Sequence, residues 1–237
     1  MRNCLVFDLG FKDYKETLEL QHRLVEKKHS DNLPEILLLV EHNPVITLGR
    51  SSHSENILLD KEQLEKLKVQ LHYIERGGDV TYHGPGQLVV YPIFNLNFYK
   101  QDTHLFLRLL EEVIIKTVES YNLKAERVKG LTGVWVEGKK IASLGVAAKK
   151  WITFHGLALN VNTDLTYFDY INPCGMRDKK VTSLTSLLNR KIDIQKVKNK
   201  TVDFFACVFD LKIINLKTAL GNTLEPENLT LSQVFKS

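Results

Sequence analysis

Residues 132–161, which read TGVWVEGKKIASLGVAAKKWITFHGLALNV, are the stretch that decides the fold class. Short apolar runs between charged or glycine-containing turns predict strands near 132–137, 140–148 and 151–161. Gly138 supplies the turn of the first hairpin. Connections this short join antiparallel strands, because parallel strands need a long crossover. The sequence therefore predicts a sheet whose strands run mostly antiparallel.

Similar patterns extend to both sides of this stretch. Further strands are predicted at 3–9, 36–40, 45–48, 71–75, 87–94 and 211–215. Helices are predicted at 12–29, 61–67, 104–121, 164–170, 183–189 and 194–210. Pro92 indicates either an edge position for its strand or the strand's end. We expect one α+β domain over residues 1–216, with a mixed, mostly antiparallel sheet and flanking helices, followed by a tail at 217–237 without recognisable chemistry.

The composition is that of an ordinary soluble globular protein, with 43% hydrophobic and 25% charged residues. The net charge of +4 is mild, and the basic residues are scattered in pairs, so no nucleic-acid partner is expected. The first residues have the pattern of a strand and leave no room for a targeting peptide. No apolar run reaches membrane-spanning length. We therefore expect a cytoplasmic protein without a membrane partner.

The three cysteines are widely spaced, and no CxxC or HExxH motif occurs. A disulfide framework and a metal site are therefore not expected. Cys4 and Cys207 stand in apolar segments, where a cysteine is usually a small buried hydrophobe. Cys174 stands instead between Pro173 and Gly175, which predicts a turn with an exposed side chain. It is either a reactive thiol or a structural one, and its context alone leaves both open.

Lys140 precedes the apolar segment 141–148, so it is expected at the start of a buried strand, where the pKa of a lysine can fall. Most lysines are simply solvated, and spacing alone does not bring Lys140 to Cys174. If the two do meet, a nearby ammonium raises the thiolate fraction of the cysteine. The pair suggests acyl transfer through a thioester on Cys174.

The segment 76–87, RGGDVTYHGPGQ, predicts a glycine-rich loop over residues 76–86. It is either an irregular turn or a functional loop, and loops this costly to order are usually functional. Its backbone allows a substrate to approach closely, with Tyr82 and His83 facing it. It lacks the spacing of a nucleotide-binding P-loop. His42 and His155 are candidates to support the same cleft, although each alone is more often structural.

Residues 76–87, 138–145, 154–160 and 171–175, together with 42–49, resemble the lipoyl(octanoyl) transferase family of the biotin/lipoate ligase superfamily. The motifs are long and in the family's order. The resemblance implies transfer of an octanoyl group from octanoyl-acyl carrier protein to a lysine of apo lipoyl domains, in 2-oxoacid dehydrogenases or the glycine cleavage H protein. This is the first step of endogenous lipoate synthesis. No cofactor is implied beyond the phosphopantetheine that carries the acyl donor.

The resemblance also implies the roles of individual residues. Cys174 would be the nucleophile that forms the acyl thioester, and Lys140 would lower its pKa and move protons. The acyl chain and its carbonyl would be held by Arg76, Gly77, Gly78, Asp79, Val80, Thr81, Tyr82, His83, Ser143, Leu144, Gly145, Gly156, Leu157 and Ala158. Backbone N–H groups around Gly145 or Gly156 are candidate oxyanion donors, because glycine permits close approach.

Three alternatives stay open from the sequence. An ATP-dependent lipoate or biotin ligase would activate a carboxylate and need no cysteine. A cysteine acyl hydrolase would resolve the Cys174 thioester with water. An acyl-binding module would use Cys174 only structurally. One acyl group and one site require no second subunit, so a monomer is expected.

Overall fold

The computed structural model describes residues 1–31, 33–172 and 180–214. Within these residues a seven-stranded sheet runs in the order β10-β1-β2-β6-β9-β8-β7. Its strands are β10 (Leu211–Ile214), β1 (Arg2–Lys12), β2 (Glu35–His42), β6 (Gln87–Ile93), β9 (Ile152–Asn160), β8 (Lys139–Lys149) and β7 (Val134–Val136). The pairs β10–β1 and β1–β2 are parallel, and the other four are antiparallel. The predicted mixed, mostly antiparallel sheet is confirmed.

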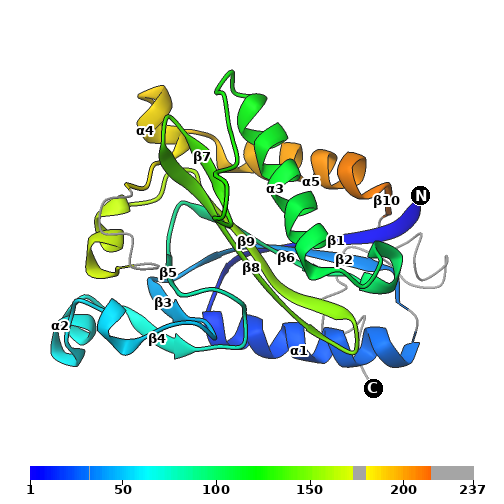
Figure 1. The fold of residues 1–237 in the computed structure, drawn as a ribbon, viewed down its shortest axis with the longest axis horizontal. Helices are drawn as coiled ribbons and strands as arrows, with labels where there is room; N and C mark the ends of the chain where they lie inside the picture. Colours follow the sequence, from blue (N-terminus) through cyan, green and yellow to red (C-terminus); the bar gives the residue numbers. More distant parts are fainter. Residues whose placement is uncertain (32, 173–179, 215–237) are drawn as a thin grey trace.

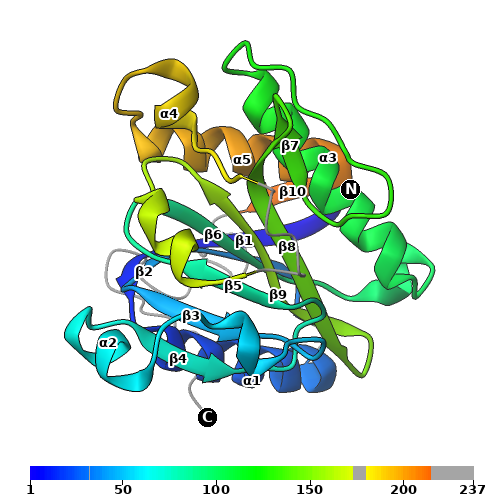
Figure 2. The same ribbon diagram turned by 60° about the vertical axis from the view of Figure 1, so that its left-hand side comes forward.

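A second, three-stranded sheet packs beside one end of the first (Figures 1 and 2). Its order is β4-β3-β5, with β4 at Gln70–Tyr73, β3 at Val45–Leu48 and β5 at Val80–His83. The strand β5 corrects the predicted loop over 76–86. Val80, Thr81 and Tyr82 are residue types common in strands, but the glycines on both sides indicate a loop. The strand β5 forms because it pairs with β3. This pairing joins segments that are far apart in the chain, so the residue spacing within either segment does not reveal it.

The long helices are α1 (Tyr14–Asp31), α3 (Thr103–Glu119) and α5 (Ile194–Phe209). Asp102 and Asp193 begin α3 and α5, because each carboxylate accepts hydrogen bonds from the first free backbone N–H groups. The short helices are α2 (Lys61–Lys66) and α4 (Leu184–Leu188), with 3-10 turns η1 (Ser54–Asn56), η2 (Leu96–Tyr99) and η3 (Leu165–Tyr170). All the predicted helices are thus present, with small shifts at their ends.

The large sheet separates two cores, with α3 and α5 on one face and α1 on the other (Figure 1). The strand β2 shows why, since all its residues are buried and its side chains alternate between the faces. Leu37 and Leu39 face the core under α3 and α5. Ile36 and Leu38 face the core under α1. Within the described residues, no helix has the length and apolarity needed to cross a membrane.

Two local predictions need a correction or a choice. Cys4 is fully buried as expected, but Cys207 is exposed, so its predicted burial is wrong. The helix α5 is amphipathic, and Phe205 and Phe209 take its inner face. Pro92 lies one residue before the end of β6, which is an interior strand. The strand-end alternative is therefore the correct one.

Candidate functional site

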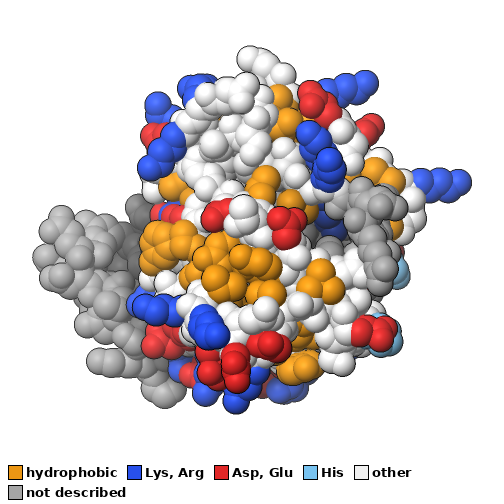
Figure 3. All heavy atoms as spheres, turned by 90° about the vertical axis from the view of Figure 1, so that its left-hand side faces the viewer, with side chains coloured by type: hydrophobic (Ala, Val, Ile, Leu, Met, Phe, Trp, Pro, Cys, Tyr) orange, Lys and Arg blue, Asp and Glu red, His pale blue; other side chains and the backbone are white. Residues whose placement is uncertain are grey.

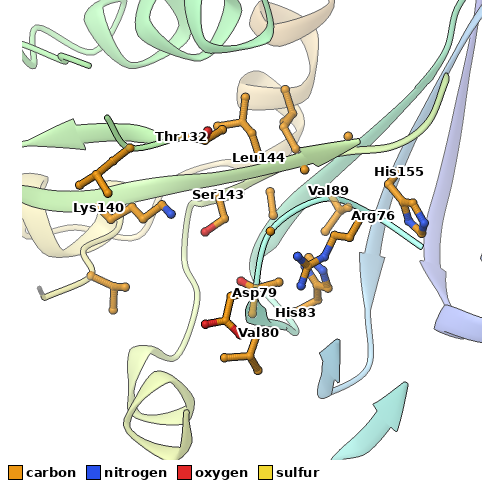
Figure 4. Close-up of a pocket in the computed structure, with 18 of the residues that line it drawn as sticks. Arg76, Asp79, Val80, His83, Val89, Thr132, Lys140, Ser143, Leu144 and His155 are labelled. Carbon is orange, nitrogen blue, oxygen red and sulfur yellow. The ribbon is translucent and has the colours of Figure 1, made fainter. Parts of the chain in front are cut away.

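A pocket of about 270 Å³ opens between the 76–81 segment, β8 and β9 (Figure 4). Its lining residues that the sequence singled out are Arg76, Gly78, Asp79, Val80, Thr81, His83, Lys140, Ser143, Leu144, Gly145, His155, Gly156, Leu157 and Ala158. Segments far apart in the chain therefore meet in one cavity.

The pocket runs along β8, with Lys140 at one end and His155 at the other (Figure 4). His155 on β9 pairs with Val146 on β8, six residues after Lys140. At the usual rise of a strand this is about 20 Å. Between the two ends lie Ser143, Leu144 and Gly145. They are only half-buried, because this part of β8 is open to the cavity. The cavity is thus elongated along β8, with the Lys140 amine at one end.

Lys140 is held against two neighbours in the hairpin formed by β7 and β8. Its Nζ lies 5.4 Å from the centre of the Trp135 ring, which is the range of a cation–π contact. Trp135 is its partner across the strands. The side chain of Lys140 also lies against Gly133. A Cβ added at Gly133 would lie only 2.6 Å from Lys140 Cε. The aliphatic stem of Lys140 therefore packs against bare backbone.

The main chain of Lys140 also pairs with the segment that follows residues 173–179. Its N–H donates to the Lys180 carbonyl at 3.0 Å, and the Thr182 N–H donates to its carbonyl at 2.9 Å. On the other side, the Asn172 N–H donates to the Asn56 carbonyl at 2.8 Å. Cys174, the predicted nucleophile, lies outside the described residues. The structure describes the residues on both sides of 173–179, and those that follow pair with Lys140.

The 76–79 segment is held in place by hydrogen bonds to β3 and to residues 49–51. The Arg76 guanidinium is buried and donates to the Thr47 carbonyl at 2.8 Å and to its hydroxyl at 3.0 Å. The N–H groups of Gly49 and Ser51 donate to the carbonyls of Asp79 and Gly78. This network gives a glycine-rich segment one defined course along the pocket.

The inner floor of the pocket is lined by aromatic rings that lie near the buried Arg76 guanidinium. Tyr14, His83 and Tyr91 line it, with the Tyr14 and His83 rings stacked at 6.0 Å. His42 lies beneath, where Nδ1 faces the Lys12 carbonyl at 2.8 Å and must donate to it. Nε2 then accepts from the Tyr91 hydroxyl, also at 2.8 Å. Burial lowers the pKa of His42 to about 4 and that of His83 to about 3.

These two imidazoles make the stability of the fold pH-dependent. Their pKa values in the folded state lie below the ordinary value of 6.5, so the unfolded chain binds more protons at mildly acidic pH. The free energy of unfolding is therefore expected to fall as pH drops below about 6.5, by up to about 1.4 kcal/mol per pH unit for each histidine. Urea unfolding at about pH 7 and about pH 5 measures this loss. The exposed His53→Gln variant should keep the same loss, and equal stability at both pH values would contradict the assignment.

His155 lies at the far end of the pocket and is held by two contacts, one to its backbone and one to its ring. It has a φ of +58°, which is unusual for a residue that is not glycine. Its N–H donates to Gln21 Oε1 on α1 at 2.7 Å. Its Nε2 lies 3.5 Å from Glu75 Oε2. Burial lowers the pKa of His155, although the contact with Glu75 opposes that shift.

Three of the predicted residues do not line the pocket. Gly77 faces away from it and donates its N–H to the Val146 carbonyl at 3.0 Å. Tyr82 belongs to the core of the small sheet, where its ring stacks on Tyr167 at 4.8 Å. His42 is fully buried beneath Tyr91. Tyr82 is therefore not part of the pocket lining, and the expectation that it faces a substrate stays a prediction.

Several lining residues were missed by the sequence analysis. They are Tyr14, Val89, Tyr91, Gly130, Leu131, Thr132, Trp135, Phe168 and Val181. Two signals were available for part of this set. Val89 and Tyr91 are two apart on a predicted strand, so they share a face. Trp135 lies opposite Lys140 once the hairpin register around Gly138 is drawn.

Among the described residues, no group of three or more His, Cys, Asp or Glu side chains is arranged to hold a metal ion. A second, shallower cavity lies beside α2 and is lined mainly by Ile57, Leu59, Leu64, Val69 and Leu71. Hydrophobic side chains gather on this side of the molecule (Figure 3). The chemistry-bearing side chains lie instead in the pocket along β8.

The chain was compared with protein families and with curated proteins. The family model of the lipoyl protein ligase A/B catalytic domain matches residues 13–206. The octanoyltransferase of Caldicellulosiruptor saccharolyticus is 48% identical over 206 residues, which are 86% of this chain and 88% of that one. The octanoyltransferase of Solibacter usitatus is 45% identical over 214 residues, covering 90% and 96% of the two chains.

Solved structures show the same fold at low identity. A lipoate-protein ligase A bound with ATP aligns with a TM-score of 0.69 and 18% identity, over 91% of this chain and 90% of that one. A structure from a study of a bi-partite lipoate protein ligase and its E2 lipoyl domain from Thermoplasma acidophilum aligns with a TM-score of 0.67 and 17% identity, over 90% of this chain and 85% of that one. These likenesses confirm the predicted ligase-like fold.

Proposed function

Because this chain belongs to the lipoyl protein ligase A/B catalytic domain family, we propose that it transfers an octanoyl group to the acceptor lysine of a lipoyl domain. Membership rests on the family model over residues 13–206 and on relatives that are 45–48% identical over most of the chain. These relatives are octanoyltransferases, so the prediction of an acyltransferase is confirmed. The family resemblance of the motifs is confirmed as well.

The proposed donor is octanoyl-acyl carrier protein, and the proposed acceptors are apo lipoyl domains of 2-oxoacid dehydrogenases and of the glycine cleavage H protein. The donor supplies the octanoyl group as a thioester on its phosphopantetheine. Going from a thioester to an amide is downhill, so the reaction needs neither ATP nor a cofactor of its own. The enzyme would carry out the first step of lipoate synthesis, as a cytoplasmic monomer.

In the first half-reaction, the Cys174 thiolate attacks the carbonyl carbon of the donor thioester. A bond from Cys174 sulfur to the acyl carbon forms, and the bond from that carbon to the pantetheine sulfur breaks. The Lys140 ammonium gives its proton to the departing sulfur. The products are octanoylated Cys174, neutral Lys140 and free acyl carrier protein.

In the second half-reaction, the amine of the lipoyl-domain lysine attacks the Cys174 thioester. An amide bond forms, the bond to the Cys174 sulfur breaks, and Lys140 accepts the proton that the amine loses. The enzyme is thereby returned to its thiolate and ammonium forms. One amine thus serves as acid in one step and as base in the next.

The observation that carries this proposal is the backbone pairing of Lys140 with Lys180 and Thr182. The chain leaving the Cys174 segment runs beside the strand that holds the proposed proton carrier. The cavity supports it further, since it extends from Lys140 over half-buried Leu144 and is also lined by the aromatic rings of Tyr14 and Tyr91. An apolar chain fits such a channel, with its carbonyl at the Lys140 end.

Intact-protein mass after brief mixing with octanoyl-acyl carrier protein tests the proposal. Wild type should gain one octanoyl group that hydroxylamine removes, and the Cys174→Ser variant should gain none. Addition of an apo lipoyl domain should then clear the enzyme and octanoylate one lysine of that domain.

Two other outcomes point elsewhere. If wild type gains no mass, but the lipoyl domain is modified when ATP and free octanoate are added, the chain is a ligase. If the octanoyl group forms on Cys174 and is lost to water at the same rate with and without a lipoyl domain, the chain is a hydrolase.

A further inference from the structure

Glu111 is a carboxylate in an apolar place. It lies on α3 beside Leu110 and is only 1% exposed. Burying a carboxylate costs free energy unless donors surround it. The donors here are Arg108 Nη1 at 2.7 Å, Arg127 Nε at 3.1 Å and the backbone N–H of Gly133 at 3.1 Å. The third donor connects α3 to the pocket.

Gly133 is the residue against which the stem of Lys140 packs. Its φ is +147°, a conformation that glycine adopts readily and other residues do not. A Cβ at this position would lie 2.6 Å from Lys140 Cε, 2.9 Å from the Ala142 carbonyl and 2.9 Å from the Trp135 ring. The course of the backbone at Gly133 therefore sets where Lys140 and Trp135 can lie.

The segment that leads to Gly133 is also tied to α3 by Arg127, which donates to Glu112 Oε2 at 2.7 Å and to the Arg108 carbonyl at 3.1 Å. It closes on itself through a pair of backbone hydrogen bonds between Glu126 and Trp135, both 2.9 Å long. Gly130, Leu131 and Thr132 then form a wall of the pocket. The Gly133 N–H bond to Glu111 joins the end of this wall next to Lys140 to the helix behind it.

We propose that Glu111 is a positioning residue for acyl transfer, which holds the 130–133 wall at the place where Lys140 needs it. The inference rests on the proposed function, in which Lys140 moves the protons. Glu111 touches neither substrate nor the reacting atoms and acts through Gly133. Both the length of its side chain and its acceptor oxygen matter for this role, whereas its charge serves the two arginines.

Two single substitutions separate length from charge. Glu111→Gln keeps the length and an acceptor for Gly133 but removes the charge. Glu111→Asp keeps the charge but is one methylene too short to reach Gly133. A displacement near 1 Å lowers the rate of a positioned reaction by about 10²-fold, so we expect Glu111→Asp to lower kcat by about that factor, with a much smaller change in KM for the acyl donor. Glu111→Gln should stay within about tenfold of wild type.

Glu112→Gln is the matched control. Glu112 is the next residue on α3 and forms an ion pair with the same Arg127 at 2.7 Å, but it does not contact Gly133. We expect its kcat to equal that of wild type. If Glu111→Gln loses more activity than Glu111→Asp, the charge carries the effect and the proposal is wrong. It is equally wrong if both variants keep the wild-type kcat.

A second readout does not depend on acyl transfer. The rate at which an amine-specific reagent labels Lys140, measured by peptide mass on the intact chain, reports the surroundings of its Nζ. This rate should change in Glu111→Asp and stay at the wild-type value in Glu111→Gln and Glu112→Gln. Unchanged labelling in Glu111→Asp overturns the inference even if the proposed octanoyl transfer is real. If wild type transfers no octanoyl group, the proposed function fails, and labelling still decides whether Glu111 positions Lys140.

Discussion

Replacing Lys140 by methionine is expected to lower the rate of octanoyl transfer by about 10²–10⁴-fold, the usual contribution of a positioned acid or base. Methionine keeps an unbranched stem that can lie against Gly133 and Trp135, so the packing of the hairpin changes little. What is lost is the proton carrier for both half-reactions. Single-turnover kinetics should therefore show slower acylation of Cys174 and slower transfer to the lipoyl domain.

Lys139→Met controls for the loss of a positive charge on the same strand. Lys139 is exposed and does not line the pocket. Its replacement should leave both half-reactions at the wild-type rate. Rates for Lys140→Met within a few-fold of wild type would show that the proton comes from elsewhere, and the pocket would then need another acid.

The fold was largely predictable because its hairpins are local. Gly138 has a φ of +72°, which is the conformation that a tight turn at this glycine requires. The strand β5 was not predictable in the same way, because its hydrogen-bonding partner β3 lies more than thirty positions earlier. Pattern within a segment reports burial and turns, whereas pairing between segments is decided by the whole fold.

The site residues divide in the same way, into those marked by a local motif and those placed by pairing between segments. Lys140, Ser143 and Gly145 could be proposed from one continuous motif, and the structure gathers them along one cavity. Trp135 belongs to no such motif, and the signal that marks it is the hairpin register around Gly138. It matters only through its register opposite Lys140. His42, predicted as a supporting residue of the cleft, is fully buried and accepts a hydrogen bond from the hydroxyl of Tyr91, which lines the pocket.

Gly156→Ala is expected to lower the free energy of unfolding by about 1–3 kcal/mol, or more if the backbone cannot shift. Gly156 lies in β9, next to the point where the antiparallel pairing of β9 with β6 ends at Leu157 and Val90. A Cβ there would run into the Val90 carbonyl oxygen and would lie 2.6 Å from Pro92 Cδ. Backbone and a proline ring cannot rotate away as a flexible side chain would. Urea unfolding of the variant and of wild type measures the loss.

Gly77→Ala is the control for this effect, because a Cβ at Gly77 would meet only the Val146 carbonyl, at an ordinary 3.7 Å. It should leave stability within about 0.5 kcal/mol of wild type. Equal stability of the two variants would mean that β9 can move away from β6 at little cost. The consequence reaches the pocket, because Leu157 and Ala158 follow Gly156 on β9 and line the cavity. If the added methyl group displaces β9, Leu157 and Ala158 move with the strand and change the wall of the cavity. Gly156→Ala should therefore also raise KM for the acyl donor, whereas a loss of stability alone would not.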